Sequence, residues 1–142
     1  MSKTAVIILA PGFEEIETVT PIDILRRGGV EVTVAGLDSR EAVGAHDIRM
    51  TCDTTLSDAA NGDYSAVILP GGMPGSQNLA NSPLVRELCL KQAERNGIVA
   101  AICAAPALAL SSFGLLADRQ ATCYPAMSDK LAADCEYIPD RD

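Results

Sequence analysis

Cys103 is the residue whose neighbours best fit a nucleophile. It follows the apolar run 98–102, typical of a buried strand, and precedes small residues expected to form a helix. Alanines around a cysteine at such a strand-to-helix turn have the pattern of a nucleophile elbow, where bulky neighbours would clash. The helix N-terminus would favour the thiolate, so we expect a pKa well below the ~8.5 of a free thiol. The alternative is a small core residue, the common use of cysteine.

Two glycines, Gly71 and Gly72, follow another apolar run at 66–69. Glycine lets backbone N–H groups approach a bound atom closely. Together with the N–H of Ala104, they could form an oxyanion hole beside the Cys103 sulfur. The alternative is an ordinary turn after a strand. The pattern matches neither the dinucleotide-binding glycine fingerprint nor a Walker phosphate loop.

Glu17 lies one turn into an expected helix and could face the same site. A carboxyl group beside a thiolate suffers like-charge repulsion and desolvation, which raise its pKa. In its protonated form it could donate a hydrogen bond to the sulfur. The alternative is a solvated acid in a first helical turn, an interpretation that suits Glu14 and Glu15 well.

Strands that alternate with helices must position these residues. We expect strands at 4–10, 31–35, 66–69, 98–102 and 120–124, helices at 14–27, 82–96, 105–112 and 126–133, and a small hairpin or edge strand within 48–55. This alternation predicts one α/β domain over 1–142, with a doubly wound, mostly parallel sheet and helices on both faces. Ligands of such sheets bind at the carboxyl ends of the strands, where the candidate residues lie.

Composition excludes several classes of function. The chain has 142 residues, with 19 acidic and 11 basic side chains and a net charge of −8, which disfavours nucleic-acid binding. No apolar run approaches the ~18 residues of a membrane span, and we expect neither a signal peptide nor a membrane partner. We therefore expect a cytoplasmic protein. Its five cysteines, an odd number, form no Cys-x-x-Cys pair, so we expect neither a disulfide framework nor a zinc ribbon. A single histidine excludes a multi-histidine metal site, and we expect no metal or cofactor.

The remaining cysteines and the histidine carry weaker predictions. Cys89 falls in an amphipathic helix and is expected in the core, whereas Cys52 and Cys135 lie in segments of uncertain structure and could be exposed. Cys123, at the end of an expected strand, is predicted to be a core residue that could lie near the site. His46 is in a polar loop, where a surface role is favoured over catalysis.

Four motifs in this order resemble the ThiJ/PfpI superfamily: APGFEEIET, VILPGG, AAICAAP and a strand that ends at Tyr124-Pro125. The resemblance covers 3–138, and within the superfamily it is strongest to the subgroup of the Parkinsonism-associated protein deglycase and its bacterial relatives. It implies a flavodoxin-like fold and a homodimer. It also assigns roles to specific residues, namely the reactive Cys103, a protonated Glu17 bonded to it, and the backbone donors Gly72 and Ala104, with Gly71 and Tyr124 as possible auxiliaries.

The resemblance also implies activities. Members are described as glutathione-independent glyoxalases of reactive 2-oxoaldehydes, as deglycases of glycated adducts, and as oxidative-stress sensors and chaperones. Tyr124 stands where many members have histidine, and tyrosine is a poor base at neutral pH, which disfavours a Cys–His protease. The family normally continues for several tens of residues with a further strand and helix. We therefore expect a fragment, or a short form with an exposed sheet edge.

Overall fold

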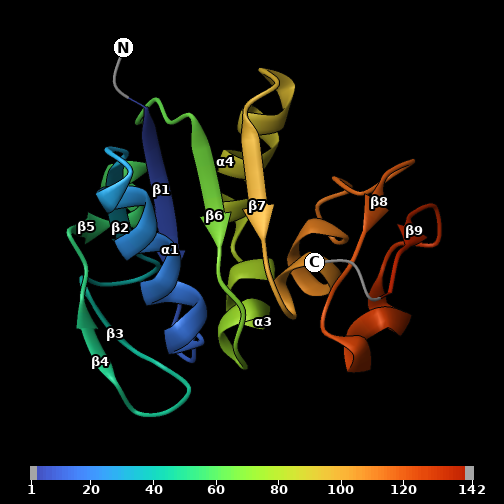
Figure 1. Cartoon of the computed structure of the whole chain (residues 1–142), viewed down its shortest axis with the longest axis horizontal. Coiled ribbons are helices and arrows are strands. Elements are labelled where there is room, and N and C mark those ends of the chain that lie inside the picture. The colour runs from blue at the N-terminus through green and yellow to red at the C-terminus, as the bar shows by residue number, and fades with distance from the viewer. Residues whose placement is uncertain (1–2, 140–142) are drawn as a thin grey trace.

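A five-stranded parallel sheet forms the centre of the computed structural model, which describes residues 3–139 (Figure 1). Its strands are β1 (Thr4–Leu9), β2 (Glu31–Gly36), β5 (Thr54–Thr55), β6 (Ala66–Leu69) and β7 (Ile98–Ala101). Their order is β5-β2-β1-β6-β7, so the chain builds outward from β1 in both directions. This confirms the predicted doubly wound α/β fold.

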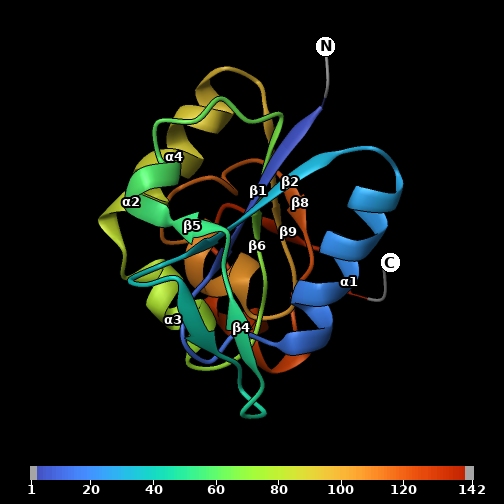
Figure 2. The same cartoon turned by 90° about the vertical axis from the view of Figure 1, so that its left-hand side faces the viewer.

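Helices cover both faces of the sheet, as Figure 2 shows from the β5 edge. One face carries α1 (Glu15–Arg27). The other carries α2 (Leu56–Ala59), α3 (Gly75–Ala80), α4 (Pro83–Glu94) and η1 (Pro106–Leu110), a short helix with π-type hydrogen bonds. In the described part of the chain, no helix combines the length and apolar character that crossing a membrane requires.

The central strand β1 explains why the sheet has two cores. Val6 and Ile8 point into the core shared with α2, α3, α4 and η1, whereas Ile7 and Leu9 point into the core beneath α1. All four side chains are fully buried. A parallel strand covered on both faces reads as a continuous apolar run, which is how its position was predictable.

The helix α4 is the predicted helix whose start is best explained. The Ser82 hydroxyl accepts a hydrogen bond from the N–H of Val85, and Pro83 occupies the first helical position. Neither α2 nor α3 was predicted, because helices of four and six residues are too short to show an apolar period.

The segments outside the central sheet differ most from the prediction. The strand expected over 120–124 is only β8 (Gln120–Ala121), and it pairs with β9 (Glu136–Tyr137) rather than with the central sheet. The helix expected over 126–133 is the 3₁₀ segment η2 (Pro125–Lys130). The hairpin expected within 48–55 instead joins β3 (Glu41–Val43) to β4 (Arg49–Thr51). Short elements of this kind are set by distant pairing partners, which local sequence does not reveal.

Candidate active site around Cys103

The chain turns sharply at Cys103, immediately after β7. Its φ is +60°, a left-handed conformation that non-glycine residues seldom adopt. The buried alanines Ala104 and Ala105 follow directly, and their small side chains let the helix start against the strand end. Such conformations cluster at functional sites, where the surrounding structure holds them in place. The turn has the geometry expected of a nucleophile elbow.

Two backbone N–H groups, those of Ala104 and Gly72, act on the Cys103 sulfur and lower the pKa of its thiol. Gly72 has a φ of +94°, and a Cβ atom there would lie 2.4 Å from the backbone N of Glu14. Only glycine therefore allows the chain to bring this N–H against the sulfur. Two fixed donors of this kind stabilise negative charge on the sulfur, or on an oxygen that forms beside it.

The Glu17 carboxyl group reaches the same sulfur from α1. Its Oε2 atom accepts a hydrogen bond of 2.9 Å from the N–H of Gly71, and a Cβ atom added to Gly71 would lie 3.2 Å from the Cys103 sulfur. A Cβ atom on Gly71 would lie 2.2 Å from Glu17 Oε2 and 2.6 Å from Cys103 Cβ. Gly71 thus leaves open the space in which the carboxyl group and the sulfur meet. The double-glycine motif predicted a close approach of the backbone here, but not this space for the Glu17 side chain.

The thiol and the carboxyl group oppose each other's ionisation. Burial raises the pKa of Glu17, partly offset by the hydrogen bonds from Cys103 and Gly71. Burial also raises the pKa of Cys103, and the charge and hydrogen bond of Glu17 raise it further, against the lowering effect of Ala104 and Gly72. The expected pKa below that of a free thiol supposed a protonated Glu17, and for that state of the pair it stays a prediction; an ionised Glu17 raises the pKa of Cys103 instead. The two groups do not ionise together near neutral pH, so the pair keeps one proton.

The site opens onto a pocket of about 360 Å³. Its walls are Glu17, Ala101, Ile102, Cys103, Pro106, Thr122, Cys123 and Tyr124. Tyr124 is half exposed at the rim, and its N–H donates to the Cys103 carbonyl oxygen at 2.8 Å. The pocket lies in the size range of small-molecule sites. Thr122 and Ile102 were not predicted as lining residues, because nothing in their local sequence signals it.

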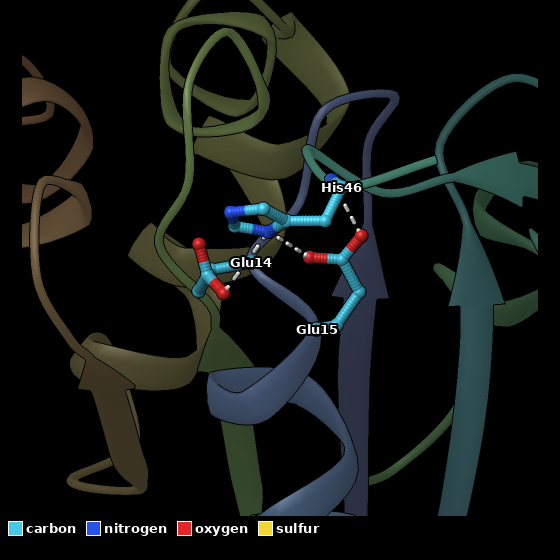
Figure 3. A group of neighbouring side chains, drawn as sticks. All are labelled: Glu14, Glu15 and His46. Atoms are coloured by element: carbon cyan, nitrogen blue, oxygen red, sulfur yellow. Dashed lines mark hydrogen bonds and ion pairs between the residues drawn. The ribbon is translucent and has the colours of Figure 1, made fainter. Parts of the chain in front are cut away.

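Glu15, two residues before Glu17, forms an ion pair with His46 (Figure 3). The expectation that Glu15 is a solvated acid is wrong, since its side chain is buried and accepts hydrogen bonds from the His46 N–H at 2.7 Å and from the His46 ring at 2.8 Å. The ring itself is exposed, as predicted. Glu14 Oε1 lies 3.5 Å from the same ring nitrogen. These three side chains could hold a metal ion, but their contacts are already explained by the ion pair.

The Glu15–His46 pair predicts a pH-dependent part of the stability. Burial alone would raise the pKa of Glu15, but the hydrogen bonds from His46 lower it to about 2, so its contribution is present above the ordinary 4.5 and lost as the pH falls toward 2. The hydrogen bond to Glu15 raises the pKa of His46, whose contribution is present below 6.5 and lost as the pH rises through the raised value.

The melting temperatures of wild type and Glu15→Gln should therefore differ most between pH 4.5 and 6.5, with a smaller difference on either side. Glu87→Gln, an exposed acid-to-amide change on α4, controls for the altered net charge. A Glu15→Gln effect that does not shrink as the pH falls below 4.5, or that grows toward pH 2, contradicts the assignment.

The other cysteines differ in their outcomes. Cys89 is buried in the core as predicted. The possible exposure of Cys52 is wrong, because it is 1% exposed beneath the β3–β4 hairpin and packs in the α1-side core. Cys135 is half-buried. Cys123 is buried as predicted and also lines the Cys103 pocket.

Comparisons with known proteins agree with this geometry. The DJ-1/PfpI family model matches residues 3–141. Protein dj-1beta of Drosophila melanogaster is 42% identical over 142 residues, which are 99% of this chain and 75% of that protein. Its crystal structure superposes with a TM-score of 0.95 at 40% identity, covering 99% of this chain and 76% of that chain.

Two further relatives carry informative names. The glutathione-independent glyoxalase DJR-1.2 of Caenorhabditis elegans is 38% identical over 140 residues, 97% of this chain and 74% of that protein. A structure described as Toxoplasma gondii DJ-1, oxidized, superposes with a TM-score of 0.90 at 32% identity, covering 95% of this chain and 74% of that chain. The chain spans only about a third of two longer Arabidopsis thaliana relatives, at 34% and 32%. The family model, the similar proteins and the shared fold together show that this chain belongs to the DJ-1/PfpI family.

Proposed function

We propose that the protein is a cysteine-dependent enzyme acting on reactive 2-oxoaldehydes, such as methylglyoxal, or on the glycated adducts that they form. The observation that carries this proposal is that Cys103 and Glu17 line the same small pocket, where two backbone N–H groups lower the pKa of the Cys103 thiol. The relative named as a glutathione-independent glyoxalase supports the same substrate class. All groups that the reaction needs belong to this chain, and we propose no cofactor.

The reaction begins with attack of the Cys103 thiolate on the aldehyde carbon, which forms a C–S bond and an oxyanion. The N–H groups of Gly72 and Ala104, which lower the pKa of Cys103, would donate to that oxyanion. Glu17 gives the oxyanion its proton and then, as a carboxylate, moves the proton of the former aldehyde carbon to the neighbouring carbon. The proton of the new hydroxyl group passes to the carbonyl oxygen of that neighbouring carbon, which leaves a thioester. Water cleaves the resulting thioester, which releases a 2-hydroxy acid and restores the Cys103 thiol.

Lactate formation from methylglyoxal without glutathione tests this proposal. We expect the wild-type protein to produce lactate well above the buffer rate, and methylglyoxal to slow alkylation of Cys103 by iodoacetamide because both compete for one sulfur. A protein that neither forms lactate nor is protected by methylglyoxal does not support the proposal. Protection without turnover points to an aldehyde-binding protein.

We propose further that the proton shared by the pair sits on Glu17. A protonated Glu17 would donate to the sulfur, and the backbone N–H groups of Gly72 and Ala104, which lower the pKa of Cys103, would stabilise the resulting thiolate. This arrangement predicts an apparent pKa for Cys103 alkylation below the ~8.5 of a free thiol. Replacing Glu17 with alanine removes a donor and should raise that pKa and slow alkylation at pH 7.

The pH profile of iodoacetamide alkylation in both proteins measures this, with Glu17→Gln as the variant of matched shape. The opposite proton position predicts the opposite sign. If Glu17 is ionised, its charge raises the thiol pKa, so that Glu17→Ala would lower it. A lowered pKa in the variant would therefore place the proton on sulfur.

A second candidate function is an oxidative-stress sensor or redox-regulated chaperone that uses oxidation of the same Cys103. Sulfur held as a thiolate and open to a pocket is what peroxide oxidises first. The similar structure described as oxidized, that of Toxoplasma gondii DJ-1, supports this second candidate function. The two functions differ in whether Cys103 turns over a substrate or accumulates oxygen.

We also propose a cytoplasmic homodimer. In support, α1 presents the apolar side chains Ile16, Val19 and Ile24 to solvent, with exposed fractions of 75%, 48% and 60%. Three large apolar side chains on one helix are typical of a surface that another chain covers. Sedimentation that gives a monomer at micromolar concentration contradicts the dimer.

A further inference from the structure

Cys123 is a second thiol in the wall of the Cys103 pocket, and the aldehyde reaction does not use it. It is 9% exposed, and its Sγ atom lies 3.4 Å from the Tyr124 carbonyl oxygen. Cys89 and Cys52, by contrast, are sealed in the two cores away from this pocket. Cys123 is therefore the one other cysteine, within residues 3–139, that shares a cavity with the reactive sulfur.

A backbone hydrogen bond fixes how far apart the two cysteines are. The Tyr124 N–H donates to the Cys103 carbonyl oxygen at 2.8 Å, and the Tyr124 nitrogen is bonded directly to the Cys123 carbonyl carbon. Covalent geometry places each Cα about 2.4 Å from its end of that bond, so the Cα atoms are at most about 7.6 Å apart. Any bend in this path shortens the distance toward the roughly 4.4–6.8 Å over which disulfides form.

We propose that Cys123 is the resolving thiol of Cys103, so that a hydroperoxide converts the pair into an intramolecular disulfide. The inference rests on the proposed reactivity of Cys103. The Cys103 thiolate attacks one oxygen of the hydroperoxide and breaks its O–O bond, leaving Cys103 as a sulfenic acid and releasing an alcohol or water. Cys123 loses its proton and attacks the sulfenic sulfur, so that an S–S bond forms and water leaves. The two thiols supply the two electrons that reduce the peroxide.

The surroundings suit a partner that acts only after oxidation. Burial raises the pKa of both thiols, but backbone N–H groups lower only that of Cys103, whereas the charges of Cys135 and Asp129 raise that of Cys123 further, so Cys103 is the thiol that meets peroxide first. The small pocket then favours the neighbouring thiol over a second peroxide molecule, which would oxidise Cys103 irreversibly to sulfinic acid. The disulfide would also occupy the sulfur that aldehydes need, so peroxide would switch the aldehyde reaction off until a dithiol reduces the bond.

Peptide mapping after mild peroxide treatment tests this directly. Trypsin cleaves after Arg95, Arg119, Lys130 and Arg141, which places Cys103, Cys123 and Cys135 in the separate peptides 96–119, 120–130 and 131–141. We expect wild-type protein, treated with one equivalent of hydrogen peroxide and blocked with iodoacetamide, to give peptide 96–119 linked to 120–130. The link should disappear with dithiothreitol, and lactate formation should return with it.

Variants separate this proposal from the proposed function. In Cys123→Ser and Cys123→Ala we expect no link and faster appearance of Cys103 sulfinic acid, whereas Cys135→Ser should keep the link. Thermal melts show that each variant is folded. If wild-type Cys103 is oxidised to sulfinic acid while Cys123 stays unlinked, or if Cys123 links to Cys135 instead, the inference is wrong although Cys103 remains reactive. If Cys103 is oxidised no faster than Cys89, the redox function fails together with the inference.

Discussion

Cys103→Ser protein is expected to form lactate from methylglyoxal no faster than buffer, a loss of about 10³-fold or more, as is typical when a catalytic nucleophile is removed. A serine hydroxyl is neutral near pH 7, and no histidine lies in the pocket wall to take its proton. The backbone donors of Gly72 and Ala104 remain, so substrate can still enter the pocket. The effect should therefore fall on turnover more than on binding.

The matched control is Cys135→Ser, which makes the same chemical change at a half-buried cysteine outside the pocket wall. We expect it to keep wild-type turnover, and both variants to melt within a few degrees of wild type. Equal lactate formation by wild type and Cys103→Ser would remove the proposed mechanism. The aldehyde would then have to react elsewhere on the chain.

The central sheet was predictable from sequence because its strands are apolar runs. β1 is buried on both faces, whereas the expectation of a buried strand at 98–102 is wrong, since β7 lies at the sheet edge with Ile98 exposed. The runs 4–10, 66–69 and 98–102 are continuous and apolar, and the structure places strands at all three. The polar segment around β3 and β4 has no such pattern. Within residues 3–139, β3 and β4 pair only with each other, over three residues each, and strands this short and polar show no apolar pattern by which sequence could locate them.

In the site too, some residues were predictable from local sequence and others were not. Cys103 and Gly72 stand where the chain must adopt a positive φ, and small neighbours or glycine reveal such positions in the sequence. Glu15 carries no local sign that it is buried, because its partner His46 comes from a loop thirty-one positions away. The roles of Thr122 and Cys123 in the pocket wall likewise arise from the return of the chain past β7. Sequence can thus identify the nucleophile more readily than the residues that surround it.

Gly71→Ala is expected to impair the site without changing any group that reacts. The added methyl would lie 2.2 Å from Glu17 Oε2 and 2.6 Å from Cys103 Cβ, both closer than side-chain atoms approach. Either the carboxyl group moves away from the sulfur or the strand end shifts, and both break the hydrogen bond between the Gly71 N–H and Glu17. Forcing an extra methyl into a packed region costs about 1–3 kcal/mol.

We therefore expect Gly71→Ala to lower the free energy of unfolding by about that amount in urea titrations, and to shift the apparent pKa of Cys103 alkylation in the direction of Glu17→Ala. Gly28→Ala is the matched control, because its φ is −78° and the nearest atoms to an added Cβ are at 3.4 Å, an ordinary contact. It should change neither stability nor alkylation appreciably. If Gly71→Ala keeps the wild-type alkylation profile, the contact between Glu17 and the sulfur does not control the reactivity of Cys103, because the methyl cannot occupy that space while the contact survives.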